Sequence, residues 1–285
     1  SSDSIVVLIK QAKNIQKKYA DRKHSIEKAA DLSFLESNDS LRNTYFVEIA
    51  LAYSKLNDSL NFRKFNTASI KLSQKIADSS ILAFNYWDLG FFYDNYDVKD
   101  SAYYNYSKAH KIFEKQKESS YAAQMLLNMA IIQADLKDYT GSEITTIEAI
   151  KIFKPLEDNF QLYKCYNNLG IIYNELEEYK QALFYHNEAL QYLNNVKKPQ
   201  TYKERTLNNI GVVYRNIGDQ KKAIEYFKKA LEYTDLIKTQ PDTYAMLLDN
   251  LALSKLRLKD TTGVFTLFNR ALQIRDSIKD IDGVT

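Results

Sequence analysis

Residues 166–190 read Tyr-Asn-Asn-Leu-Gly-Ile-Ile-Tyr-Asn-Glu-Leu-Glu-Glu-Tyr-Lys-Gln-Ala-Leu-Phe-Tyr-His-Asn-Glu-Ala-Leu. Apolar residues recur three and four positions apart on both sides of the acidic pair Glu177-Glu178, which is the spacing of one helix face. The stretch therefore predicts two antiparallel helices joined by a short turn. We expect Gly170 and Ala182 to let the two backbones approach, and Ala189 to admit the next helix.

The same pair of small residues, nineteen positions apart, recurs along the chain. The pairs are Ala50…Ser69, Gly90…Ala109, Ala130…Ala149, Gly170…Ala189, Gly211…Ala230 and Ala252…Ala271, and successive pairs start 40, 40, 40, 41 and 41 residues apart. A step of 40 residues back from Ser69 reaches Ala29, so a weaker unit opens the chain. Seven hairpins are therefore expected, at approximately 3–38, 39–78, 79–118, 119–158, 159–198, 199–239 and 240–280, with helices of about 17 residues.

The composition agrees with an almost wholly helical protein. The 285 residues include only seven Gly and three Pro, whereas an all-β sandwich or barrel needs turn residues every 8–12 positions. No apolar run approaches the roughly 18 residues that a membrane helix needs. The net charge of +3 is too small to suggest nucleic-acid binding, and the single cysteine, Cys165, forbids an internal disulfide.

Two units carry a resemblance to a known family. Leu169-Gly170-x-x-Tyr173 with Ala182, His186 and Ala189 resembles the tetratricopeptide repeat, and Ile210-Gly211-x-x-Tyr214 with Ala223, Phe227 and Ala230 matches it better. The resemblance implies an all-α, right-handed superhelical solenoid that forms one domain over residues 1–285, with the first helix of each hairpin lining the concave surface. The 40-residue period exceeds the usual 34 or so, which implies lengthened helices. The last residues resemble the entry to another unit, so we expect the natural protein to continue.

Catalytic and cofactor motifs are missing from the sequence. Phosphate-binding loops, zinc-protease helices and nucleophile elbows are all absent. The three histidines, His24, His110 and His186, fall in different units, so we interpret them as core or flank residues. Cys165 is interpreted as an inert packed thiol. We expect no metal, no cofactor and no enzymatic activity.

The aromatic residues have two interpretations. Twenty-two Tyr and 14 Phe suggest stacking platforms for single-stranded nucleic acid, but Tyr53, Tyr93, Tyr173 and Tyr214 recur at the repeat period. That spacing favours packing between helices. In the third unit Phe84, Trp87 and Phe91, near Asp94, predict an exposed aromatic anchor patch, although Trp87 also suits the core.

A polar set on the first helices of the last three units is the main candidate site. Carboxamides both donate to and accept from peptide bonds, and arginines bind carboxylates, so the set predicts a groove for an extended or helical peptide. Asn167, Asn208 and Arg215 are expected to bind a ligand, and Asn208 and Arg215 to do so without filling the core. For Asn168, Asn209 and Asn250 a structural role, bonding to the preceding hairpin's backbone, is an equal alternative. The set is Lys164, Asn167, Asn168, Asn174, Glu175, Arg205, Asn208, Asn209, Arg215, Asn216, Asp249, Asn250 and Arg257.

The function predicted is a non-catalytic binding solenoid whose partner is a protein or peptide. Its composition is similar to the sensor arrays of bacterial histidine kinases and transcriptional regulators. That similarity implies a periplasmic sensing module, with Ser1 close to a leader cleavage point and a membrane helix following in the full-length protein. No membrane insertion and no nucleic-acid binding is expected of this segment. The alternatives are a cytoplasmic signalling-peptide receptor or assembly scaffold, and an accessory domain of an enzyme whose catalytic domain lies elsewhere.

Overall fold

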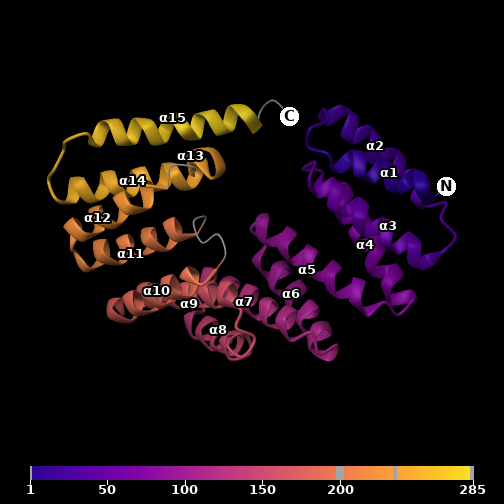
Figure 1. Cartoon of the computed structure of the whole chain (residues 1–285), viewed down its shortest axis with the longest axis horizontal. Helices are drawn as coiled ribbons and strands as arrows, with labels where there is room; N and C mark the ends of the chain where they lie inside the picture. The colour runs from indigo at the N-terminus through magenta and orange to yellow at the C-terminus, as the bar shows by residue number, and fades with distance from the viewer. Residues whose placement is uncertain (1, 197–201, 234–235, 283–285) are drawn as a thin grey trace. The chain divides into compact units, whose positions relative to one another are not determined.

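Helices account for every regular element in the part of the chain that the structure, a computed structural model, describes (Figure 1). The described residues are 2–196, 202–233 and 236–282. Contacts between helices divide the chain into two units, which we call the N-terminal unit (Ser1–Leu136) and the C-terminal unit (Lys137–Thr285). The predicted boundary at 198/199 lies outside the described residues. The predicted entry to a further unit covers residues 280–285; of these, 280–282 belong to the helix Val264–Asp282 and 283–285 lie outside the described residues.

The N-terminal unit consists of three helical hairpins and the first helix of a fourth. Neighbouring helices pack on one another in chain order, so each hairpin is joined to the next through its second helix. The helices are α1 (Ser2–Lys13), α2 (Tyr19–Ser33), α3 (Asp39–Ser54), α4 (Ser59–Lys75), α5 (Ser79–Asn95), α6 (Lys99–Lys115) and α7 (Ser119–Asp135).

The C-terminal unit repeats this arrangement and adds a single helical turn, α13. The pairs α9–α10, α11–α12 and α14–α15 form hairpins, and α11 also contacts α9 and α14, the first helices on either side of it. The helices are α8 (Tyr139–Phe153), α9 (Asn159–Glu175), α10 (Tyr179–Asn194), α11 (Lys203–Ile217), α12 (Gln220–Leu231), α13 (Leu236–Thr239), α14 (Pro241–Arg257) and α15 (Val264–Asp282). Helices α5, α6, α7, α9 and α14 are each 17 residues long, as predicted.

The expected all-α architecture of consecutive helical hairpins is confirmed. Helices begin close to the predicted unit boundaries, since α3, α5, α7 and α9 start at positions 39, 79, 119 and 159. That all seven hairpins form one continuous domain stays a prediction.

One residue in the left-handed conformation closes most turns between helices. Asn57 (φ 57°) and Glu177 (φ 61°) occupy it in two hairpins, and Gly218 (φ 97°) occupies it in a third. The next N–H then bonds to a carbonyl five residues back, as from Glu178 to Tyr173 at 2.8 Å, which satisfies the free end of the first helix. The side chain of Asp219 caps the following helix by accepting from the N–H of Lys222. This geometry accounts for the acidic junctions in the sequence.

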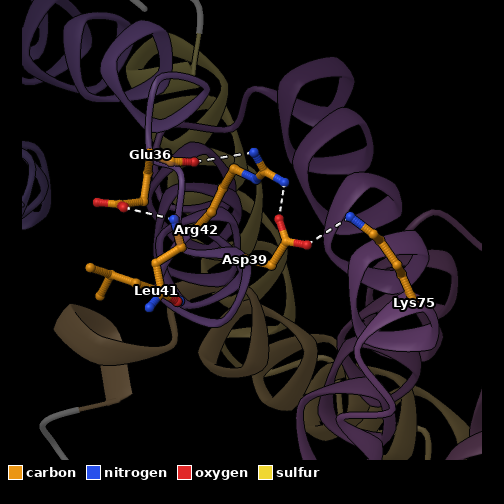
Figure 2. Close-up of polar contacts among 6 residues, drawn as sticks. Glu36, Asp39, Leu41, Arg42 and Lys75 are labelled. Atoms are coloured by element: carbon orange, nitrogen blue, oxygen red, sulfur yellow. Dashed lines mark hydrogen bonds and ion pairs between the residues drawn. The ribbon is translucent and has the colours of Figure 1, made fainter.

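A polar network fixes the start of α3 in the N-terminal unit (Figure 2). Arg42 donates to the carbonyl oxygen of Glu36 at 3.1 Å and pairs with Asp39 in the same turn of α3. Lys75, at the end of α4, pairs with the other oxygen of Asp39 at 2.7 Å. The hydrogen bond from Lys75 lowers the pKa of Asp39. The two helices of this hairpin are therefore joined at the end opposite their turn.

The recurring glycines accommodate aromatic rings. A Cβ added to Gly90 would lie 2.5 Å from the Tyr106 ring, and one added to Gly211 would lie 2.6 Å from Phe227. In both cases the ring stands sixteen residues later, on the second helix, and is almost completely buried. The sequence-based explanation, that glycine lets two backbones approach, is wrong in this detail, because a side chain fills the space.

Tyrosines at the repeat period pack between helices, as predicted. Tyr173 stacks on Tyr185 with ring centroids 5.1 Å apart, and Tyr214 stacks on Tyr226 at 5.4 Å. Tyr53 is buried against Phe65. These rings stabilise the hairpins, so they no longer serve as an argument for a nucleic-acid platform.

Candidate functional site

Asparagines on neighbouring first helices of the C-terminal unit bond to one another. Helix α11 lies between α9 and α14, and each of its asparagines bonds to an asparagine 42 positions away on one of these two helices. We call this set the amide ladder. Its hydrogen bonds run from Asn209 Nδ2 to Asn167 Oδ1 (3.3 Å), from Asn216 Nδ2 to Asn174 Oδ1 (3.1 Å) and from Asn250 Nδ2 to Asn208 Oδ1 (2.8 Å). The structure thus brings together the candidate residues of three helices.

The buried edge of this surface has a structural role. Asn168 is 5% exposed and donates to Ser142 Oγ at 3.2 Å and to Thr146 Oγ1 at 2.9 Å, both on α8. Its amide therefore ties α9 to the preceding helix, through side-chain hydroxyls rather than the backbone contacts that the sequence suggested. Asn167 is also buried, and its Oδ1 accepts from Thr206 Oγ1 at 3.2 Å.

Asn208 and Arg215 differ from the sequence-based expectation. Asn208 is 5% exposed, so the prediction that it stands clear of the core is wrong. Arg215 is half-buried over the ring of Phe227 and donates from Nη1 to Asn250 Oδ1 at 2.8 Å. Asn250 in turn donates to Asn208, so the guanidinium ends a hydrogen-bonded chain of two amides. Burial, followed by the charge of nearby Arg257, lowers the pKa of Arg215.

Cations border the amide ladder with few acids to neutralise them. Arg205 is exposed on α11 and has no ion pair or hydrogen bond with any residue that the structure describes. Lys164 lies 5.1 Å from the centroid of the Phe160 ring, and burial lowers its pKa. Asp249 is paired with Arg275 at 2.6 Å. The surface is therefore suited to an anionic group.

His186 occupies the ring position that Tyr106 and Phe227 hold in other hairpins. Its ring lies where a Cβ on Gly170 would stand, and its Nδ1 is 3.1 Å from Asn167 Oδ1. Since the amide oxygen only accepts, Nδ1 carries the proton and donates. Burial lowers the pKa of His186 to about 3, so the ring is neutral. The interpretation as a core histidine is correct.

Acid should destabilise the chain through His186. Between about pH 6.5 and 3 the unfolded chain binds a proton at this histidine and the folded chain does not, so stability falls as the pH is lowered. The expected loss is roughly 1 kcal/mol per pH unit below 6.5. Urea denaturation at pH 7.5, 6, 5 and 4.5 measures it, with His186→Phe as the reference because Phe227 fills this position in the next hairpin. Identical pH profiles for both proteins would contradict the assignment.

The aromatic patch of the third unit is partly exposed. Phe84 (39% exposed) stacks on half-buried Trp87, with centroids 6.0 Å apart and planes at 17°, and meets Phe113 and Tyr121 edge-on. These four rings form one cluster. Phe91, 58% exposed, instead lines a pocket in the N-terminal unit that the sequence reasoning missed.

The described residues include no group of three or more His, Cys, Asp or Glu that could hold a metal ion. Cys165 is buried, and burial raises its thiol pKa to about 12. His110 is half-buried, with Nδ1 3.0 Å from the carbonyl oxygen of Ala122. Among the described helices, none is both long and apolar enough to cross a membrane.

Comparison with known proteins agrees with this architecture. The tetratricopeptide repeat family model matches residues 121–195 and 166–235. No curated protein matches the chain. Residues 121–235 therefore match tetratricopeptide repeats, and further helical hairpins precede and follow them.

Several solved structures share the fold at low sequence identity. The apo form of RapI has a TM-score of 0.74 at 14% identity, covering 93% of this chain and 94% of its own. A Rap protein complexed with Competence and Sporulation Factor has a TM-score of 0.70 at 15% identity, covering 98% and 78%. The signal transduction ATPase PH0952 from Pyrococcus horikoshii, which has a tetratricopeptide repeat sensor, has a TM-score of 0.73 at 15% identity, and the match covers 97% of this chain but 43% of that protein.

Proposed function

We propose that the chain is a non-catalytic binding module that holds an extended peptide along the amide ladder of the C-terminal unit. The observation that carries this proposal is the row of bonded amides bordered by unneutralised cations, Lys164 and Arg205 above all. Buried amides hold the row in place, and the outer ones lie at the surface.

Hydrogen-bonding capacity remains on the outer amides. Asn209 and Asn216 each use one N–H within the ladder, and their Oδ1 atoms have no partner among the described residues. A peptide backbone laid across them finds acceptors for its N–H groups and donors for its carbonyls. Because these amides on α11 are already bonded to side chains of α9, little side-chain entropy is lost when a ligand binds.

The charge indicates which peptides fit. Arg205 and Lys164 suit a C-terminal carboxylate or an acidic side chain, because a charged donor adds more than a neutral one. A Rap protein complexed with Competence and Sporulation Factor and a Rap conjugation gene regulator in complex with the Phr* peptide share this fold. Peptide binding is a property of those proteins, and the shared fold supports the proposal that the partner of this chain is also a peptide.

Replacing Arg205 by Ala is expected to weaken peptide binding about tenfold or more, as loss of a charged hydrogen bond of about 1.5–3 kcal/mol implies. Folding should be unaffected because Arg205 has no partner within the described residues. A screen of peptide libraries on the immobilised protein supplies the ligand, and calorimetry measures the affinity. Lys221→Ala is the matched control, since Lys221 is an exposed cation on α12. Equal weakening by both variants, or by neither, would contradict the proposed surface.

A sensing role in signal transduction is the finer part of the proposal. We infer that this module detects a peptide for a larger bacterial signalling protein, most simply in the periplasm. A receptor for a signalling peptide in the cytoplasm is the second candidate, favoured by the fold shared with the quorum sensor NprR from B. thuringiensis (TM-score 0.65, 13% identity). The complete reading frame distinguishes them: a leader with a downstream membrane helix supports the periplasmic sensor, and a frame with neither supports the receptor.

A further inference from the structure

A pocket of about 540 Å³ opens in the N-terminal unit between α3, α4 and α5, far along the sequence from the amide ladder. Side chains from the last turns of α3 and α5 and the first turn of α4 form it. Five of its residues are apolar or aromatic, and the only charged one is Asp88. The lining residues are Leu51, Ser54, Asn57, Ser59, Phe62, Asp88, Phe91, Phe92, Asn95 and Tyr96.

The carboxylate of Asp88 has no partner among the described residues. No hydrogen bond or ion pair involves it, and burial alone raises its pKa to about 6. Other acids on the first helices of this unit are paired: Glu48 with Lys13, and Asp94 with Lys99. A half-buried carboxylate that lacks such a partner would be stabilised by a bound cation or a hydrogen-bond donor.

The repeat explains why Asp88 is left alone. It stands two residues before Gly90, and at the same place before Gly170 stands Asn168, which donates to Ser142 and Thr146. At the position equivalent to Ser142, α4 carries Phe62, which has no hydroxyl to donate. At the position equivalent to Thr146 it carries Asn66, whose Nδ2 donates to the carbonyl of Asn85 instead.

Aromatic rings form the other wall of the pocket. Phe92 stacks on Phe62 with centroids 4.9 Å apart, and its ring lies 4.6 Å from that of Tyr96. Phe91 contributes a fourth ring, which is 58% exposed. The faces of such rings attract cations, and the attraction strengthens where water is excluded.

We propose that this pocket binds an organic cation, a primary ammonium or guanidinium group on an apolar stem, with Asp88 as its counter-ion and the four rings around the stem. An anion would be repelled by Asp88, and a neutral apolar ligand would leave that carboxylate buried and unpaired. A divalent metal prefers several oxygen ligands, whereas this pocket offers one carboxylate. The site goes beyond the proposed peptide surface and lies in the other unit, so either can fail alone.

The test uses n-butylammonium and its neutral counterpart n-butanol as probes, on the full chain labelled with fluorinated phenylalanine. Butylammonium is expected to cause saturable shifts of ring resonances at pH 7.5, with butanol at least tenfold weaker. Asp88→Asn should weaken butylammonium binding at least tenfold without unfolding the chain, since it removes a buried charge and keeps the side-chain shape. Asp97→Asn is the matched control, because its carboxylate is 88% exposed in the same unit.

Three results would overturn the proposal. They are the absence of a saturable shift with butylammonium, an affinity for butanol equal to that for butylammonium, and an Asp88→Asn variant that binds butylammonium as tightly as the original protein does. Binding should also weaken as the pH falls below about 6, because protonation removes the charge on Asp88. A blocked peptide, acetyl-Gly-Lys-Gly-amide, tests the source of the cation. Tighter binding of the peptide than of butylammonium supports a lysine side chain, and the reverse supports a free amine; both require the same Asp88 dependence.

Discussion

Phe227→Ala should lower the free energy of unfolding by about 3–5 kcal/mol, the usual cost of removing a large buried ring. The side chain is completely buried, and it fills the space left by Gly211 on the facing helix. Its ring also lies under the guanidinium of Arg215. Truncation therefore leaves a cavity between α11 and α12 that the glycine cannot help to close.

Urea denaturation followed by circular dichroism measures this loss. Phe265→Ala is the control, because the Phe265 side chain is 77% exposed on α15 and its removal should cost less than about 1 kcal/mol. Similar losses for the two variants would show that the ring of Phe227 does not hold the hairpin together. Loss of peptide binding without loss of stability would instead place Phe227 in the binding surface.

Periodicity was enough to predict the architecture of this chain. Small residues at Gly90, Ala130, Gly170 and Gly211 mark the same position in successive hairpins, and the helices begin close to the boundaries that this spacing predicts. In a repeat protein, the same residue type recurs at equivalent positions of several units. Such a recurrence is stronger evidence for the fold than the pattern of any single helix.

Turn geometry was less accessible from the sequence. Ala77, Lys117 and Lys137 all adopt the left-handed conformation, although none is a residue type that favours it. The hydrogen bonds of the helix ends on both sides impose that conformation. A search for glycine at helix ends would have found only Gly218 and Gly263 among the described turns.

The candidate site was predicted as a set of residues but not as a network. The sequence placed Asn167, Asn208 and Asn250 on one face, yet side chains 42 residues apart in α11 and α14 bond only because the helices lie in register. The burial of each side chain was harder to predict than its place on a helix face, as the buried Asn208 shows. The sequence did not single out Asp88, because an acidic side chain on a helix is ordinarily solvated. Asp88 lacks a hydrogen-bond donor because Phe62, on a different helix, stands where another hairpin has a serine.

Gly170→Ala should destabilise the chain by about 1–3 kcal/mol, the range for overfilling a packed core. The new Cβ would lie 2.5 Å from the His186 ring, which cannot retreat because it is buried and hydrogen-bonded to Asn167. At the small-residue position of the repeat, glycine occurs in the hairpins where a fully buried ring follows sixteen residues later, whereas Ala50 is followed by Asn66 at that spacing. The last hairpin pairs Ala252 with Phe268, which is only half-buried.

The Ala50–Asn66 pair supplies the control for this prediction. In a His186→Asn background, which copies that pair, Gly170→Ala should cost less than half as much, because the smaller side chain leaves room for the methyl group. The four proteins form a double-mutant cycle, measured by urea denaturation at pH 7.5, where His186 is neutral in both the folded and the unfolded chain. Equal costs in the two backgrounds would mean that the glycine serves the backbone conformation of α9. A reduced cost would show that the size of the side chain on the second helix determines whether glycine or alanine is tolerated at the facing position of the first helix.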